Sequence, residues 1–241
     1  MGNKTVNIFW TGGWDSTFRL LQLLLVEKKI VQPHFVVRAQ ASVGKEINTM
    51  IDIRRELFRS YPQTRSLLQP TRYSDIDGVS EFDPISSSLE DLSRRYEIAQ
   101  QYDFCSRYCR EHNIYDMELC IEKDSNPQLF LSPYIDSDSW TDSISTDNDG
   151  SLMCEIFKYY RFPLIKMTKT DMEKYSYERG WNEIMKMTWF CATPYNEKPC
   201  GFCGPCTYTI EEGLSWRIPF IRRLFSIIHM PLRRFYRNKI K

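Results

Sequence analysis

Two apolar runs separated by a glycine-rich turn, close to the N-terminus, place the strongest limits on the fold. Val6 to Trp10 has the length and composition of a buried strand, and Phe18 to Leu25 has those of a buried helix. Between them lies the sequence Thr11-Gly12-Gly13-Trp14-Asp15-Ser16-Thr17. A strand that leads through a tight turn into a helix is typical of an α/β domain with a parallel sheet.

The alternation of strand and helix patterns continues along the chain, which supports an α/β class with a largely parallel sheet. A capping box of Thr170 to Glu173 predicts a helix start, and Gly180 predicts the end of that helix. The Ser- and Asp-rich segment from Asp136 to Gly150 is predicted to be a surface loop. The remaining predicted strands are Phe35–Val37, Asp116–Ile121 and Phe162–Ile165, and the remaining helices are Glu46–Ser60 and Leu89–His112.

Three regions are predicted: an α/β domain over 1–187, a cysteine-rich knuckle over 188–213 and a basic amphipathic tail over 214–241. The whole chain has a net charge of +1, but the tail holds eight basic residues and no acidic one. No apolar run reaches the roughly 18 residues of a membrane span, and the N-terminus does not have the pattern of a signal peptide. A cytoplasmic protein is therefore expected. The basic residues of the tail are Arg217, Arg222, Arg223, Arg233, Arg234, Arg237, Lys239 and Lys241.

The glycine turn has the features of an anion-binding loop. Ligands of open α/β sheets bind at the carboxyl ends of strands, where this turn is expected to lie. Glycines permit close approach of the backbone, and the following helix offers free amide groups and a partial positive charge. Asp15 would repel a phosphate unless Mg²⁺ lies between them. A simple tight turn with a helix cap is the alternative, and neither the dinucleotide fingerprint nor the Walker pattern is present.

Four of the eight cysteines lie within sixteen residues, as Cys191-x8-Cys200-x2-Cys203-x2-Cys206. Four thiolates at this spacing can surround one tetrahedral Zn²⁺, and an iron–sulfur cluster is the competing interpretation. A zinc ion with four protein ligands has no open coordination position, so its expected role is structural. Core packing is the simpler interpretation for the other cysteines and for His34, His112 and His229.

The glycine turn resembles the Ser-Gly-Gly-x-Asp-Ser signature of the PP-loop ATP pyrophosphatases, which are adenine nucleotide alpha-hydrolase-like proteins with a HUP-like fold. Thr11 replaces the serine of that signature. The resemblance implies that ATP is cleaved to AMP and pyrophosphate after a substrate oxygen attacks the α-phosphate. Carried over by position, the residues that bind pyrophosphate would be Thr11, Gly12, Gly13, Asp15, Ser16 and Thr17.

The segments 163–172 and 188–206 are similar to the terminal elements of 7-cyano-7-deazaguanine synthases, which belong to queuosine biosynthesis. That resemblance implies an ATP-dependent ligase that uses ammonia to convert 7-carboxy-7-deazaguanine into the nitrile. It also implies structural Zn²⁺ on the four cysteines, and catalytic roles for Asp15 and Lys169, the latter at the phosphates. A solvated lysine at a helix start is the alternative interpretation of Lys169.

The middle of the chain departs from that family. Arg38 to Ala41 replaces its Tyr-Gly-Gln-Arg-His element, Arg94 to Tyr96 its Gly-Arg-Asn element, and Glu122 to Pro127 its Asp- and Gly-rich substrate segment. The features for ATP and zinc are thus retained, while those for the base are not. A small-molecule acid other than the deazapurine is therefore an open alternative substrate.

Two further functions remain open. One is sulfur transfer to a tRNA base, for which Cys105 or Cys120 would supply the thiol. The other is a degenerate nucleotide sensor or partner-binding protein that has kept the glycine turn and the cysteine group but has lost catalysis. The tail is expected to form an amphipathic helix that packs on its own domain or across a homodimer and keeps a solvated basic face. Binding to a nucleic acid, a membrane or another partner is the alternative.

Overall fold

The protein is described here by a computed structural model covering residues 5–123, 125–136, 139–140 and 148–228. Its centre is a seven-stranded sheet in the order β3-β2-β1-β4-β7-β6-β5. The first five strands of that order are parallel, and β6 and β5 continue antiparallel at one edge. The strands are β1 (Val6–Phe9), β2 (Val31–Val37), β3 (Arg72–Asp75), β4 (Met117–Glu118), β5 (Ile135–Asp136), β6 (Ser139–Trp140) and β7 (Tyr160–Arg161).

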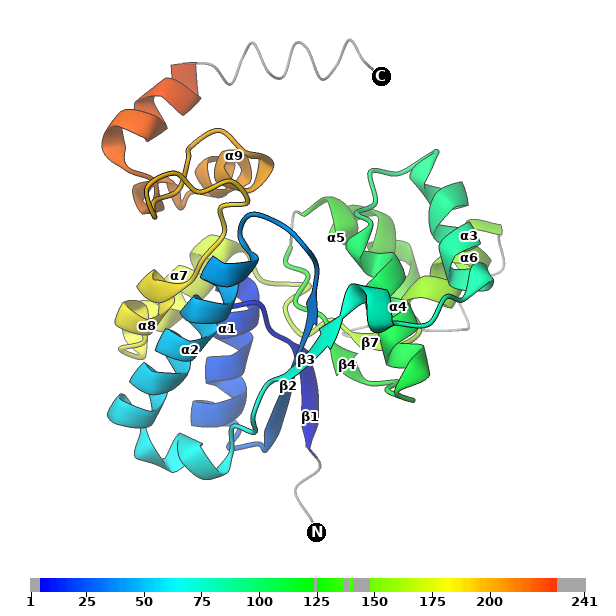
Figure 1. The fold of residues 1–241 in the computed structure, drawn as a ribbon, viewed down its shortest axis with the longest axis horizontal. Helices are drawn as coiled ribbons and strands as arrows, with labels where there is room; N and C mark the ends of the chain where they lie inside the picture. The colour runs from blue at the N-terminus through cyan, green and yellow to red at the C-terminus, as the bar shows by residue number, and fades with distance from the viewer. Residues whose placement is uncertain (1–4, 124, 137–138, 141–147, 229–241) are drawn as a thin grey trace.

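Helices cover both faces of the sheet, as Figure 1 shows. One layer holds the first two helices and the pair that precedes the cysteine region, and the other layer holds the helices from the middle of the chain. The predicted α/β class with a largely parallel sheet is confirmed. The helices are α1 (Trp14–Leu21), α2 (Val43–Ser60), α3 (Asp83–Ser93), α4 (Gln101–Glu111), α5 (Asn126–Leu131), α6 (Asn148–Phe157), α7 (Lys169–Glu178), α8 (Asn182–Met187) and α9 (Gly204–Glu211).

Each layer has its own apolar core because alternate residues of a strand point to opposite faces. On β1 and just after it, Ile8 and Trp10 join the core beneath α1 and α2, whereas Phe9 joins the core beneath α3, α4 and α6. Arg19 of α1 forms a bidentate ion pair with Glu118 of β4, with both N–O distances at 2.8 Å. This pair fixes the first helix against the strand that lies beside β1.

Three expectations for secondary structure are corrected. Residues 89–112 form two helices rather than one. The chain turns at 94–100, where Ile98 is buried and the Tyr96 hydroxyl donates a hydrogen bond to Asp149 Oδ2. The short strand expected at Phe162–Ile165 lies two residues earlier, at β7, and a turn follows it.

The capping box also lies two residues earlier than expected. Thr168, not Thr170, caps α7, and its partner at the third helical position is Asp171. Lys169 is consequently the first residue of this helix, and its direction is set by the cap. The end at Gly180 is confirmed, with φ of +70°.

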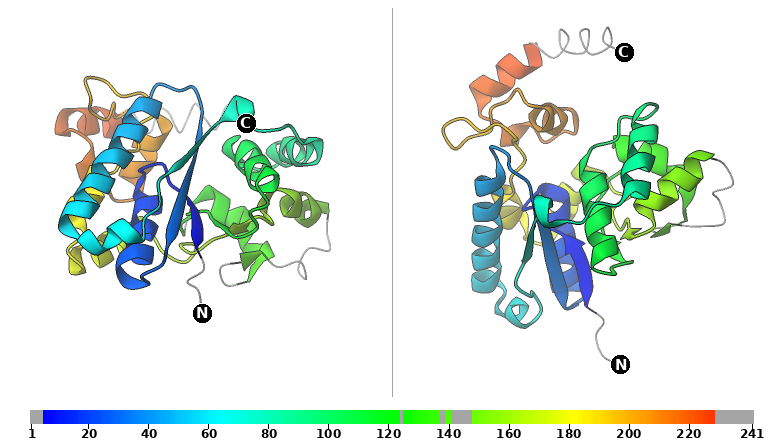
Figure 2. Two further views of the ribbon diagram at one scale, coloured as in Figure 1. Left: turned by 60° about the horizontal axis from the view of Figure 1, so that its bottom comes forward. Right: turned by 45° about the vertical axis from the view of Figure 1, so that its right-hand side comes forward.

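The cysteine region and the start of the tail form a separate layer above the sheet (Figure 2). Ser215–Arg217 is a 3₁₀ turn, and residues 220–228 are helical. Residues 229–241, with five of the eight tail basic residues, lie outside the described part, as does most of the expected loop at 136–150. Within the described residues, no helix has the length and apolar character needed to cross a bilayer.

Candidate functional site

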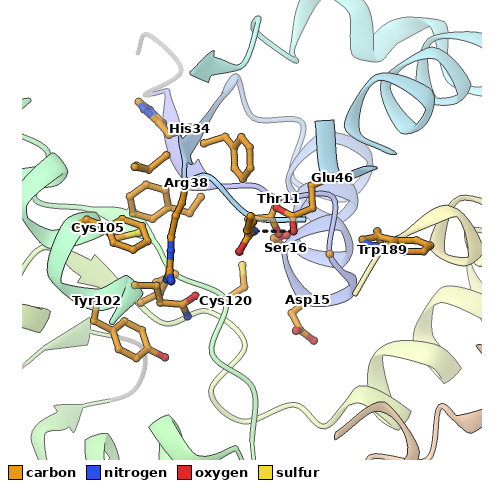
Figure 3. Close-up of a pocket in the computed structure, with 18 of the residues that line it drawn as sticks. Thr11, Asp15, Ser16, His34, Arg38, Glu46, Tyr102, Cys105, Cys120 and Trp189 are labelled. Carbon is orange, nitrogen blue, oxygen red and sulfur yellow. Dashed lines mark hydrogen bonds between the residues drawn. The ribbon is translucent and has the colours of Figure 1, made fainter. Parts of the chain in front are cut away.

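A cavity of about 370 Å³ lies at the carboxyl ends of β1, β2 and β4. The sheet grows from β1 in both directions, with β2 on one side and β4 on the other, so a crevice forms between the two connections. The residues that line it come from the ends of these strands, from α1 and α4, and from the cysteine region (Figure 3). This is the place where an open α/β sheet binds its ligand.

The glycine turn forms the floor of the cavity next to the start of α1. Gly12 has φ of +72°, and a Cβ added there would lie 3.0 Å from Thr49 Cγ2. Gly13 caps α1 with extended backbone. The first three amides of the helix, at Trp14, Asp15 and Ser16, have no acceptor within the helix. Together with the helix dipole, these amides form a cradle for an anion.

Four of the six predicted loop residues line this cavity, namely Thr11, Gly13, Asp15 and Ser16. Gly12 is not among the lining residues, and its carbonyl accepts a hydrogen bond from the Trp189 amide at 2.9 Å.

The sixth residue, Thr17, is fully buried, and its hydroxyl accepts a bond from Trp10 Nε1 at 3.0 Å. Its side chain therefore holds the helix against β1 and does not face the cavity.

Lys169 lies against Asp15 and two further carboxylates. Its Nζ is 3.6 Å from Asp15 Oδ2, 3.3 Å from Glu122 Oε1 and 2.8 Å from Glu212 Oε2. The expectation of a solvated helix-start lysine is wrong, because the Lys169 side chain is only 16% exposed. We call these four residues the carboxylate cluster.

The carboxylate cluster carries more negative than positive charge. Burial opposes the charged form of Lys169, but its three acidic neighbours outweigh this effect and raise its pKa. Burial, followed by the charge of Asp15, raises the pKa of Glu122 to about 7. Sequence reasoning missed Glu122 and Glu212, although the position of Glu122 just after a predicted strand was a usable signal.

One oxygen of the cluster lacks a partner. Asp15 Oδ1 is buried and, among the described residues, accepts no hydrogen bond. A buried carboxylate oxygen without a partner is costly, and a divalent cation would supply one. Mg²⁺ prefers carboxylate and phosphate oxygens, so Asp15 fits the role expected for it.

The opposite wall of the cavity carries a guanidinium group. Arg38 follows β2, and Figure 3 shows its side chain extending into the cavity on the side of Tyr102. No carboxylate in the described part of the chain forms an ion pair with Arg38. Because phosphate would occupy the glycine turn, a second anionic group could bind at this wall.

Two thiols also face the cavity, those of Cys105 on α4 and Cys120 after β4. Burial raises the pKa of both well above the ordinary value for cysteine. Both are therefore neutral thiols in the absence of a ligand.

His34 lines the cavity as well, but both of its ring nitrogens have partners. Nδ1 lies 2.7 Å from the Tyr108 hydroxyl, and Nε2 lies 3.0 Å from Asn7 Oδ1. Burial lowers the pKa of His34 to about 4. The neutral ring is a structural link between β1, β2 and α4, as expected.

The four cysteines of the knuckle form a compact group. Their sulfur atoms all lie within 4.8 Å of one another, and Cys200–Cys206 and Cys191–Cys203 are each 3.8 Å apart. Four sulfurs at about 2.3 Å from one ion have this spacing. In a four-iron cluster each thiolate binds a different iron, which would place the sulfurs farther apart. The group thus fits a single tetrahedral ion.

The cysteine group is physically joined to the glycine turn. The Trp189 amide bonds to Gly12, and Trp189 and Phe190 form part of the cavity wall. Arg217 secures the junction, because its guanidinium lies 4.9 Å from the Trp14 ring and 4.5 Å from the Phe190 ring. Burial lowers the pKa of Arg217 to about 10.

Arg217 also donates to the carbonyl and the hydroxyl of Thr188 at 2.6 and 2.7 Å. This member of the predicted basic tail is thus an internal connection and not part of a solvated basic face.

Comparisons with known proteins add little to this description. No protein-family model matches the chain, and no curated protein matches it either. Among solved structures, the chain is similar to the U34-tRNA thiolase NcsA from Methanococcus maripaludis with its 4Fe-4S cluster. The identity is 14% and the TM-score 0.44, with 96% of this chain and 73% of that chain covered. This similarity is too low to carry an inference about function.

Proposed function

We propose that the protein is an ATP-dependent enzyme of the PP-loop type that activates a carboxylic acid as its adenylate. The observation that carries the proposal is the glycine turn, which opens into a cavity with anion-binding amides on one side and Arg38 on the other. The cavity can therefore hold two anionic groups at separate walls.

The chemistry follows from those two walls. The amides of the turn and the Thr11 and Ser16 hydroxyls would bind the β- and γ-phosphates. Arg38 would hold the substrate carboxylate, whose oxygen attacks the α-phosphorus. The bond from that phosphorus to the bridging oxygen breaks, and pyrophosphate leaves with the electron pair. Preorganised amides stabilise the charge of the leaving group.

The carboxylate cluster would act on the metal and on the leaving phosphates. Mg²⁺ bound at Asp15 would neutralise charge on the phosphates. Lys169 Nζ lies 3.6 Å from Asp15 Oδ2 and would contact the same phosphates. We therefore propose for Asp15 and Lys169 the catalytic roles predicted from the sequence.

For the acid itself we propose 7-carboxy-7-deazaguanine, with ammonia as the second substrate, on the strength of the resemblance in 163–172 and 188–206. For the cysteine group we propose structural Zn²⁺, supported by the spacing of the four sulfurs. Backbone amides donate to the sulfurs, as Cys200 N does to Cys191 at 3.2 Å and Gly201 N does to Cys206 at 3.3 Å. Such bonds stabilise the thiolate form that a metal requires.

The test is pyrophosphate release from ATP and Mg²⁺ with 7-carboxy-7-deazaguanine and ammonium. Wild type is compared with Asp15→Ala and with the control Asp91→Ala, whose carboxylate lies exposed on α3. Release that depends on the acid and is lost only in Asp15→Ala supports the proposal. ATP binding without stimulated release would reject the deazapurine, and no ATP binding would favour a partner-binding protein without catalysis.

Sulfur transfer to a tRNA base is the second candidate, and one observation favours it. Cys105 and Cys120 both line the cavity beside the glycine turn, although they lie on different elements. A thiolase would need a cysteine at this position to carry or accept sulfur. Substitution of Cys105 or Cys120 by Ser distinguishes the two functions, because only thiolation would be abolished.

A further inference from the structure

We propose that the helix formed by residues 220–228 docks the protein peripherally on an anionic lipid surface. This inference is independent of the ATP chemistry. It rests on which side of the helix contacts the protein, which side faces solvent and what charge accompanies it.

The helix contacts the cysteine region by one narrow side. The Arg222 guanidinium donates to the carbonyl oxygens of Tyr195, Lys198 and Pro199 at 3.1, 3.2 and 2.8 Å. Gly201 lies so close that an added Cβ would be 3.0 Å from Arg222. Ser226, one turn later, is buried. Residues 222 and 226 therefore fix the orientation of the helix.

The side that faces away from the protein is apolar. Six large side chains of the helix are between 48% and 68% exposed. At 3.6 residues per turn they span an arc of about 160°, opposite the two contact residues. Figure 1 shows the helix at the edge of the molecule, beyond the cysteine region and away from the sheet. The six are Phe220, Ile221, Leu224, Phe225, Ile227 and Ile228.

An apolar stripe of this width normally packs against a core, so its exposure indicates an external contact. The sequence around the stripe carries charge of one sign, because 214–241 holds eight basic residues and no acidic one. Arg217 and Arg222 are held by internal contacts, which leaves six basic residues. Arg223 borders the stripe, with its guanidinium 5.4 Å from the Phe220 ring. An amphipathic helix with Phe, Leu and Ile on one face and basic neighbours is typical of binding to the membrane interface.

The positive charge near the stripe also argues against a second copy of the chain or a nucleic acid as its partner. In a symmetric dimer the same patch meets itself, so both copies would bring positive charge and no acidic residue of the tail would offset it. Nucleic acids bind through phosphate contacts and base stacking, but four of the six side chains in the stripe are aliphatic and only Phe220 and Phe225 offer a ring. An anionic bilayer satisfies both the apolar stripe and the positive charge.

The experiment is flotation of the full chain with vesicles made of equal parts of phosphatidylcholine and phosphatidylglycerol, and with vesicles of phosphatidylcholine alone. Leu224→Asp alters the stripe, and Leu129→Asp is the control, because that leucine is exposed on α5. Metal content and a melting curve check that each variant is folded.

We expect the wild type to bind the anionic vesicles, with an affinity that decreases as salt is added. Leu224→Asp should bind these vesicles roughly tenfold more weakly or worse, and Leu129→Asp should bind them as the wild type does. Arg223→Ala should weaken binding roughly fivefold. Absence of binding by the folded wild type, or equal binding to both vesicle types, would overturn the proposal. A dimer in solution that Leu224→Asp dissociates would instead assign the stripe to a second copy, and RNA binding lost in that variant would assign it to RNA.

Discussion

Replacing Glu122 by Gln tests the electrostatics of the carboxylate cluster directly. The carboxylate lies 3.3 Å from Lys169, but it shares that one ammonium group with Asp15 and Glu212. Burial and the Asp15 charge raise its pKa from 4.5 to about 7. At pH 8 the folded protein must therefore hold an ionised group that its surroundings disfavour.

The magnitude and its pH dependence follow from linkage. Below pH 4.5 Glu122 is protonated in both the folded and the unfolded chain, so it favours neither state. As pH rises from 4.5 to about 7, the unfolded chain ionises first, and stability is progressively lost. The difference between the two pKa values corresponds to about 3 kcal/mol. Glu122→Gln, which imitates the protonated acid, should recover this amount at pH 8 and nothing at pH 4.

The assay is urea unfolding of wild type and variant from pH 4 to pH 8, with Glu90→Gln as the exposed control. The control should change the free energy of unfolding by less than about 0.5 kcal/mol at any pH. Mg²⁺ should stabilise the wild type more at pH 8 than at pH 5, because it compensates the same excess charge. A variant that is equally or less stable than wild type at pH 8 would refute this account of the cluster.

Three further predictions test the loop, the metal and the acid-binding wall. Gly12→Ala should lose about 1–2 kcal/mol of stability because residue 12 has a positive φ, and it should bind ATP more weakly. Gly44→Ala is the control, because there is open space around Gly44, and it should show neither loss. Urea unfolding measures the stability, and titration with ATP measures the affinity. Removing the metal from the four cysteines by chelation should lower ATP affinity as well as stability, because Trp189 joins the cysteine region to the glycine turn. Isothermal titration before and after chelation measures the ATP affinity, and an unchanged affinity would contradict the prediction. Arg38→Ala should raise KM for the acid roughly tenfold to hundredfold and leave KM for ATP unchanged. The exposed Arg55→Ala serves as its control, and a rise in KM for ATP alone would place Arg38 at the nucleotide instead.

Local patterns were enough to predict the parts of the site that lie close together in the sequence. The first strand, the glycine turn and α1 form one continuous unit, and the cysteines lie within sixteen residues, so both features were visible without a structure. Edge elements were harder, because β3 has the polar sequence Arg72-Tyr73-Ser74-Asp75 and gains its strand character from pairing with β2. The first residue of α7 was also predicted wrongly, because Thr168 and Thr170 can both cap a helix and only tertiary contacts decide between them.

The carboxylate cluster was predicted only in part, for a different reason. Its four residues come from four separate parts of the chain. The family resemblance pointed to Asp15 and Lys169, whereas Glu122 and Glu212 belong to no motif. The four residues meet because α7 places Lys169 beside the start of α1, while the end of α9 brings Glu212 from the cysteine region. The cysteine knuckle therefore contributes a charged group to the cluster as well as a wall to the cavity. The structural role proposed for an ion in the knuckle is thus compatible with a direct electrostatic influence of Glu212 on Lys169 and Asp15.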